Sequence, residues 1–160
     1  MTIHENDQDR ENQTAAVDAI RFNIQCLPFI GRYSEVKETK RHHHMPYDFQ
    51  VWQWGKCVGL GEVKCRMKYE AAFFERNGWF MDTDRLNRLA KAGKGYDVML
   101  VLMTGDRRVF YVMLADLIKR RKDLKKKTGI GTDDHGKIKN DKEGYLIPFW
   151  MLTEVENKGL

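Results

Sequence analysis

The segment Tyr96–Met103 is the strongest clue to the fold, because it is an almost unbroken run of apolar side chains. Such a run is typical of a strand that is covered on both faces, whereas a strand with one wet face alternates between apolar and polar residues. Gly105 and Asp106 interrupt the run, and a second strand is expected from Arg108 to Leu114. These strands predict an α/β protein with a mixed central β-sheet flanked by helices.

The length of the chain favours one domain. With 160 residues, 42% of them apolar, we expect a single domain over residues 1–160, with a core over about 12–114 and an extension over about 115–160. No segment approaches the ~20 apolar residues of a membrane span. The first residues are polar and unlike a secretory signal. We therefore expect a cytoplasmic protein with no membrane partner.

The remaining elements are predicted from periodicity, caps and turn residues. Val17, Ile20 and Ile24 have helical spacing, and alternating residues on both sides of Gly55 indicate a hairpin. Asp82 is a typical helix cap. The expected elements are a helix over about 12–25, a loop over 34–46, strands over 47–53 and 57–66, a helix over 82–95, a basic helix over 119–127, a polar loop over 129–144, and an edge strand or packed tail over 145–152.

The charge distribution favours a polyanionic partner. The net charge is +5, and residues 119–127 hold seven basic side chains against one acid. We expect nucleic-acid contacts from this segment and from the end of the second hairpin strand, and the alternative is a solvated basic surface. The candidate residues are Arg66, Lys68, Lys119, Arg120, Arg121 and Lys122.

Two acids and a lysine lie on the predicted hairpin. Asp48 is near the start of the first strand, and Glu62 and Lys64 are on the second. Side chains two apart on a strand share a face, so Glu62 and Lys64 point together while Val63 points to the opposite layer. Surface ion pairs are the alternative. Because both faces of this strand look covered, charges placed in it are more typical of a functional site.

This set of groups suits a hard metal ion. The Asp48 and Glu62 carboxylates and the Val63 carbonyl are oxygen ligands of the kind that Mg²⁺ or Mn²⁺ prefers. Such an ion polarises a phosphate and acidifies a bound water. Lys64 would orient or deprotonate that water, or neutralise the developing oxyanion, and its position in the sequence does not separate these roles.

The pattern Pro46-Tyr-Asp48, then Gly61-Glu-Val-Lys64, then helix, strand and strand resembles the PD-(D/E)xK nuclease superfamily over about residues 12–114. The resemblance implies a restriction-endonuclease-like core of αβββαβ type. It implies that Asp48, Glu62 and the Val63 carbonyl bind the metal and that Lys64 is the catalytic base. Here Tyr47 separates the proline from the acid. Many members add an acid from the first helix, for which Glu11 and Asp18 are the candidates.

The resulting expectation is a Mg²⁺-dependent endonuclease that hydrolyses phosphodiester bonds in DNA. Its size is similar to that of Holliday-junction resolvases, which favours branched or structured DNA, a homodimer, and a phage or mobile-element origin. The alternatives are a binding module on the same fold that does not cut, and a nuclease directed at RNA. We interpret His42–His44 as part of a loop, and the alternative is a phosphate contact.

Overall fold

The computed structural model describes residues 7–23, 27, 34–39, 47–132 and 138–157. The predicted features at His42–His44 and Pro46 lie outside these ranges. The helices and strands are, in order, α1 (Asp7–Phe22), β1 (Ser34–Glu38), β2 (Phe49–Gln53), β3 (Lys56–Arg66), α2 (Ala71–Asn77), β4 (Trp79–Asp82), α3 (Thr83–Ala92), β5 (Asp97–Thr104), β6 (Val109–Met113), α4 (Leu114–Lys119), β7 (Lys125–Thr132), β8 (Ile138–Ile147) and β9 (Thr153–Val155).

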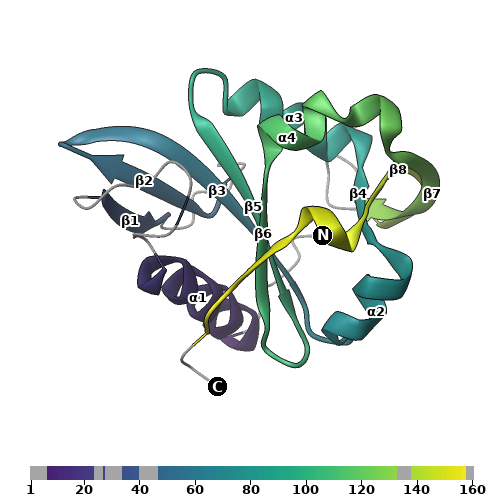
Figure 1. Ribbon diagram of the computed structural model, residues 1–160, viewed down its shortest axis with the longest axis horizontal. Coiled ribbons are helices and arrows are strands. Elements are labelled where there is room, and N and C mark those ends of the chain that lie inside the picture. The colour runs from purple at the N-terminus through teal and green to yellow at the C-terminus, as the bar shows by residue number, and fades with distance from the viewer. Residues whose placement is uncertain (1–6, 24–26, 28–33, 40–46, 133–137, 158–160) are drawn as a thin grey trace.

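A mixed central sheet organises the molecule, as predicted. Its strand order is β1-β2-β3-β5-β6-β9, in which β3 and β5 are parallel and every other neighbouring pair is antiparallel. A second, three-stranded sheet has the order β4-β8-β7 and lies at the opposite side of the molecule from the β1–β2 end (Figure 1). The predicted α/β class with a mixed sheet is confirmed, and the second sheet was not predicted.

Each face of the central sheet is covered by a separate apolar cluster. On one face, Val63 and Val101 pack with the buried side of α1. On the other face, Leu60 and Leu100 pack with side chains of α3, α4 and the second sheet. After its first residue, β5 is buried along its whole length. Burial on both faces explains why Tyr96–Met103 is an apolar run without alternation.

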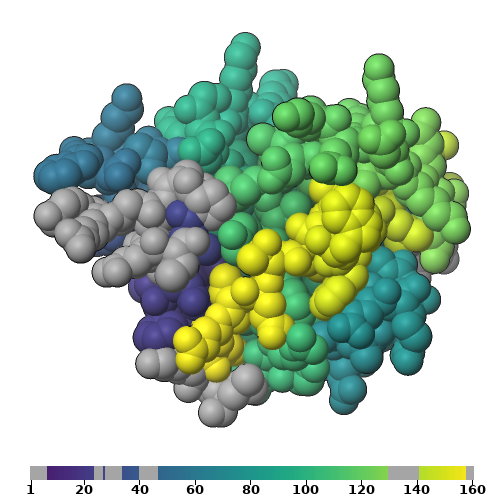
Figure 2. Space-filling view, viewed as in Figure 1, coloured from purple at the N-terminus to yellow at the C-terminus, as the bar shows by residue number. Residues whose placement is uncertain are grey.

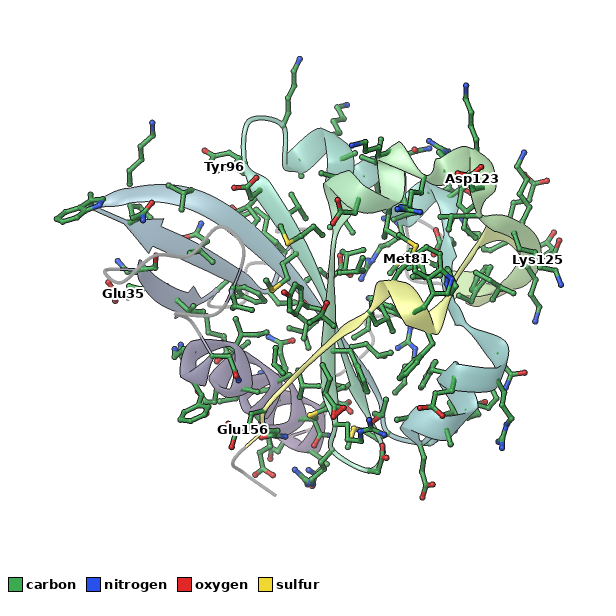
Figure 3. All side chains as sticks on the ribbon, viewed as in Figure 1. Glu35, Met81, Tyr96, Asp123, Lys125 and Glu156 are labelled. Carbon is green, nitrogen blue, oxygen red and sulfur yellow. The ribbon has the colours of Figure 1, made fainter. Side chains whose placement is uncertain are left out.

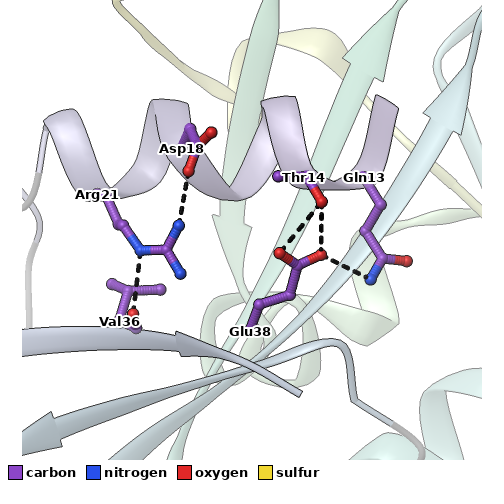
Figure 4. Close-up of polar contacts among 6 residues, drawn as sticks. All are labelled: Gln13, Thr14, Asp18, Arg21, Val36 and Glu38. Atoms are coloured by element: carbon purple, nitrogen blue, oxygen red, sulfur yellow. Dashed lines mark hydrogen bonds and ion pairs between the residues drawn. The ribbon is translucent and has the colours of Figure 1, made fainter. Parts of the chain in front are cut away.

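The predicted loop over 34–46 is wrong at its start, where β1 forms the edge of the central sheet. Only Val36 of β1 is buried, so the strand has too little apolar pattern to be found from sequence. Polar contacts attach α1 to this strand (Figure 4). The Thr14 hydroxyl donates to Glu38 at 3.0 Å, and Arg21 Nε donates to the Val36 carbonyl at 3.1 Å.

The predicted basic helix and polar loop are also wrong. Helix α4 ends at Lys119, a 3₁₀ turn covers Arg121–Asp123, and the lysines that follow begin β7. Of the segment predicted as a polar loop, residues 129–132 belong to β7 and residues 138–144 to β8, two strands that pair antiparallel, while residues 133–137 lie outside the described ranges. Lysines are common on solvated edge strands, where they discourage pairing with another chain. A lysine-rich edge strand and a lysine-rich solvated helix therefore look alike in sequence, because neither shows an apolar periodicity.

The C-terminal segment closes the far edge of the central sheet. After β8 ends at Ile147, a 3₁₀ turn leads into β9, which pairs with β6. Figure 2 shows this segment crossing the surface from the side of the second sheet toward α1. Asn23, at the end of α1, donates to the Glu156 carbonyl at 2.7 Å. In the described part of the chain, no helix has the length and apolar character needed to cross a membrane.

Candidate functional site

Backbone contacts between the two hairpin strands position Asp48. Its N–H donates to the Gly61 carbonyl at 2.7 Å, and its Oδ2 accepts a hydrogen bond of 2.7 Å from the Val63 N–H. Asp48 directly precedes β2, and the Trp54–Gly55 turn, with φ of 54° and 73°, has the left-handed geometry of a tight hairpin. The hairpin register therefore places the Asp48 carboxylate beside the centre of β3.

Glu62 and Lys64 share one face of β3, as predicted. Val63 packs in the apolar cluster on the α1 side, whereas Leu60, which has the same parity as Glu62, packs on the opposite side. The Glu62 residue is only 2% exposed. Lys64 Nζ lies 2.9 Å from Glu62 Oε1. The predicted convergence of two acids and an ammonium group therefore has a structural counterpart around Glu62.

Arg85 is also part of the site, although it was not predicted from the sequence. Its Nη2 forms an ion pair with Glu62 Oε1, the same oxygen that Lys64 contacts. Arg85 is in the first turn of α3, where its N–H donates to the capping Asp82 carboxylate at 2.8 Å. It immediately precedes Leu86, whose side chain packs into the core below α3. A basic residue at the edge of the apolar stripe of α3 is the signal that could have identified it.

The carboxylate of Glu62 is in an unusual polar environment. Its Oε1 forms ion pairs with two cationic side chains, and neither of its two buried oxygens accepts a hydrogen bond from the residues that the structure describes. A buried carboxylate is unfavourable unless other groups compensate for the lost hydration. The charge of Glu62 is thus compensated by two ion pairs, while its oxygens keep hydrogen-bonding capacity for a further ligand.

The electrostatics of the site shift two pKa values in opposite directions. Burial raises the pKa of Asp48, and the nearby Glu62 charge adds to this effect, although the Val63 hydrogen bond opposes it. Burial lowers the pKa of Lys64, and the positive charge of Arg85 lowers it further against the opposing effect of Glu62. Both groups are therefore moved toward their neutral forms, which brings them closer to exchanging protons near neutral pH.

The packing of Phe49 explains why the Gly61-Glu-Val-Lys64 pattern begins with a glycine. Phe49, its partner in the hairpin register, is fully buried with its ring over the glycine. A Cβ at position 61 would lie 1.9 Å from the Phe49 Cζ atom. The missing side chain lets the ring pack directly against the β3 backbone, one residue before Glu62.

The chain has no match among protein-family models, curated proteins or solved structures. The functional interpretation therefore depends on the geometry of the chain's own residues. That geometry includes the Asp48 and Glu62 carboxylates, the Val63 peptide that links the two strands, and the cations Lys64 and Arg85.

The donor atoms at the site fit a divalent cation. Mg²⁺ is usually held by one or two carboxylates and completes its octahedron with waters and substrate oxygens. Asp48 and Glu62 supply two carboxylates, and Glu62 Oε2 is a buried oxygen without a hydrogen bond from the described residues. Within the described ranges, no cluster of three or more His, Cys, Asp or Glu side chains could hold a metal. Two carboxylates, with water completing the coordination, are a donor set that suits Mg²⁺ or Mn²⁺.

The acids proposed to come from the first helix do not join this site. Asp18 pairs with Arg21 at 2.6 Å on the exposed side of α1 (Figure 4). Glu11 is exposed as well, and the buried polar residue of α1 is its neighbour Asn12, which accepts a hydrogen bond from Gln8.

The predicted nucleic-acid-binding residues form two groups. The first follows Lys64 along the chain: Arg66 ends β3, and the exposed Lys68 lies in the turn before α2. Desolvation and, secondly, the positive charge of Arg85 lower the pKa of Arg66, which indicates that these two guanidinium groups are neighbours. A cationic surface therefore extends from the carboxylates toward the end of β3.

The second group lies between α4 and β7. The Arg120 guanidinium is 5.2 Å from the centre of the Trp150 ring, and Arg121 donates to the Tyr145 hydroxyl at 2.8 Å. Lys119 and Lys122 are exposed. Figure 3 shows that this part of the molecule, marked by Asp123 and Lys125, is opposite the end marked by Glu35.

Proposed function

We propose that the protein is a metal-dependent nuclease that hydrolyses phosphodiester bonds in DNA. The observation that carries the proposal is the buried Glu62 carboxylate, which is next to Asp48 in the hairpin and is contacted by Lys64 and Arg85. Replacing buried ion pairs by apolar residues often stabilises a protein, so such a cluster is poorly explained by stability alone. A role in chemistry accounts for its position.

The order of elements supports a restriction-endonuclease-like core. Helix α1 is followed by the antiparallel strands β1, β2 and β3, and a connection through α2, β4 and α3 then leads to β5, parallel to β3. The order resembles the αβββαβ arrangement expected from the sequence, with α2 and the second-sheet strand β4 added to the connection. Asp48 directly precedes the second strand of that arrangement and the Glu62-Val-Lys64 segment lies in the third, as the resemblance to PD-(D/E)xK nucleases implies.

Each residue of the site would have a separate role in the hydrolysis. Asp48, Glu62 and the Val63 carbonyl would hold Mg²⁺ or Mn²⁺, which would polarise the scissile phosphate and acidify a bound water. Lys64, whose pKa is lowered by burial, would orient or deprotonate that water or neutralise the developing oxyanion. Arg66, Lys68 and the group around Arg120 bind the backbone of the DNA through its phosphates. A branched or structured substrate and a homodimer remain part of this proposal by analogy with resolvases.

A cleavage assay tests the proposed function. The purified chain is incubated with supercoiled, linear, single-stranded and four-way-junction DNA and with RNA, in Mg²⁺, Mn²⁺ or EDTA. Glu62→Ala and Lys64→Ala are assayed in parallel, and Lys91→Ala, which removes an exposed charge from the last turn of α3, is the matched control. We expect metal-dependent cleavage of DNA that Lys91→Ala retains and the two site variants lose by at least ~100-fold.

Other outcomes of this assay identify the alternatives. DNA binding without cleavage in either metal would establish a binding module instead. Cleavage restricted to RNA would replace the substrate, and cleavage that survives both site substitutions would remove Glu62 and Lys64 from the mechanism.

A further inference from the structure

Arg85 differs from the other charged residues of the site because it comes from a different layer of the fold. Glu62 and Lys64 are two residues apart on β3, whereas Arg85 reaches Glu62 from the first turn of α3. Its side chain is 30% exposed, compared with 2% for Glu62. Solvent and ligands can therefore approach Arg85 while it is in contact with the buried carboxylate.

The contact between Arg85 and Glu62 leaves hydrogen-bonding groups unused on both side chains. The ion pair joins Arg85 Nη2 to Glu62 Oε1, the oxygen that Lys64 also contacts. Both Glu62 oxygens and Arg85 Nε are buried without a hydrogen-bond partner in the described part of the protein. A stable arginine–carboxylate pair is commonly a two-pronged fork that uses both oxygens. This contact is instead one that a stronger ligand can replace.

Positive charge already compensates the carboxylates when no metal is bound. The Lys64 ammonium and the Arg85 guanidinium both contact Glu62, and Arg66 adds a further cation near Arg85. A divalent cation at the carboxylates adds two further positive charges beside those cations, so repulsion opposes its binding. Arg85 can relieve that repulsion, since its long, partly exposed side chain can leave while its backbone stays held by Asp82.

We propose that Arg85 is the counter-ion of Glu62 in the metal-free protein, competes with the metal for that carboxylate, and moves to the substrate phosphate when the metal binds. This inference rests on the proposed function. A guanidinium fork matches two oxygens of a phosphodiester, which a lysine ammonium does not. The same side chain thus stabilises the empty site and then binds the DNA that the loaded site cuts.

The test measures metal binding separately from cleavage. Mn²⁺ alone, without DNA, is titrated calorimetrically into the wild-type chain and into Arg85→Ala, Arg85→Lys, Glu62→Gln and the control Lys91→Ala. Cleavage of DNA in saturating Mn²⁺ is measured for the same proteins, and circular dichroism melting verifies that each is folded. Arg85→Lys keeps the positive charge but loses the fork, so it separates competition with the metal from phosphate binding.

We expect opposite effects of Arg85→Ala on the two measurements. Its Mn²⁺ affinity rises on the order of tenfold, because a positive charge next to the ion is removed, whereas its cleavage rate at saturating Mn²⁺ falls. Arg85→Lys binds Mn²⁺ about as the wild type does but cleaves more slowly, and Lys91→Ala changes neither quantity. A residue that only maintains the fold would not tighten metal binding when it is removed.

Two results would overturn the inference in distinguishable ways. If Arg85→Ala binds Mn²⁺ no more tightly than the wild type while Glu62→Gln abolishes binding, Arg85 does not compete with the metal, and the proposed function stands without it. If neither the wild type nor Arg85→Ala binds Mn²⁺, the metal-dependent function fails and the inference fails with it.

Discussion

Residues from β3, α3 and the start of β2 together determine the environment of the Glu62 carboxylate. Its strand neighbour Val63 donates to Asp48, Lys64 approaches along the same face, and Arg85 arrives from α3. One residue earlier, Gly61 lets the Phe49 ring lie against the strand. The position of Glu62 thus depends on packing below β3 as well as on charges above it.

We expect Gly61→Ala to destabilise the protein by roughly 2 kcal/mol, because the new methyl group would overlap a fully buried Phe49 ring. Urea denaturation followed by circular dichroism measures the change. The control is the double variant Phe49→Leu/Gly61→Ala, whose destabilisation is expected to be less than the sum of the two single changes. Strictly additive effects would show that the ring and the glycine are not coupled.

Helix α2 illustrates how one element depends on a distant turn. Its own N-cap residue, Glu70, makes no side-chain capping bond, and the Ala71 N–H instead donates at 3.0 Å to Asp106 in the β5–β6 turn. The neighbouring Gly105 N–H donates to the Tyr69 carbonyl at 2.7 Å. This turn therefore holds the connection between β3 and α2, in which the cationic residue Lys68 lies.

We expect Asp106→Ala to lower the free energy of unfolding by about 1 kcal/mol at pH 7, the usual effect of losing a helix cap. Burial opposes ionisation of Asp106, but hydrogen bonds from Thr104 and Ala71 outweigh it and lower its pKa below the ordinary 3.8. A lowered pKa in the folded state contributes stability above pH 3.8, and that contribution is lost as the pH falls through the folded pKa.

Thermal or urea unfolding of the wild type and of Asp106→Ala at pH 7 and near pH 3 tests this expectation. The stability difference between the two proteins should shrink at the lower pH. Asp106→Asn, which keeps an oxygen acceptor, should fall between them at pH 7. An Asp106→Ala protein as stable as the wild type at pH 7 would show that the turn does not cap α2.

The two ends of the described chain meet at one side of the central sheet. Strand β9 pairs with β6 at its edge, and Val155 enters the apolar cluster that also contains Ala16 and Ile20 of α1. Asn23 then bonds to the Glu156 carbonyl. The face of the sheet opposite Glu62 is therefore closed by segments from both ends of the sequence (Figure 1).

We expect Val155→Asp to destabilise the whole protein by about 3 kcal/mol, because it places an unpaired carboxylate at a position that is 7% exposed. Thr153→Asp, at an exposed position two residues earlier in β9, is the matched control and should change stability by less than ~0.5 kcal/mol. Urea unfolding compares the two variants. Equal stability of the two variants would contradict a role for β9 in closing the core.

Features with a local pattern could be predicted from the sequence. The apolar run of β5 indicated a strand covered on both faces, the alternation around Gly55 indicated the hairpin, and Asp82 capped α3 as expected. Alternation also placed Glu62 and Lys64 on one face, since that relation follows from the geometry of a single strand. Strands with few apolar residues, such as β1 and β7, were misread because solvated edges carry no such pattern.

Features that depend on contacts between distant segments required the folded structure. Arg85 reaches Glu62 only because the connection through α3 places its first turn over β3, and no spacing in the sequence records that distance. Likewise, Asp106 caps α2 across 35 residues, and β9 finds the edge of β6 from the end of the described chain. Periodicity reports the environment of an element, but only the packing of elements shows which side chains meet.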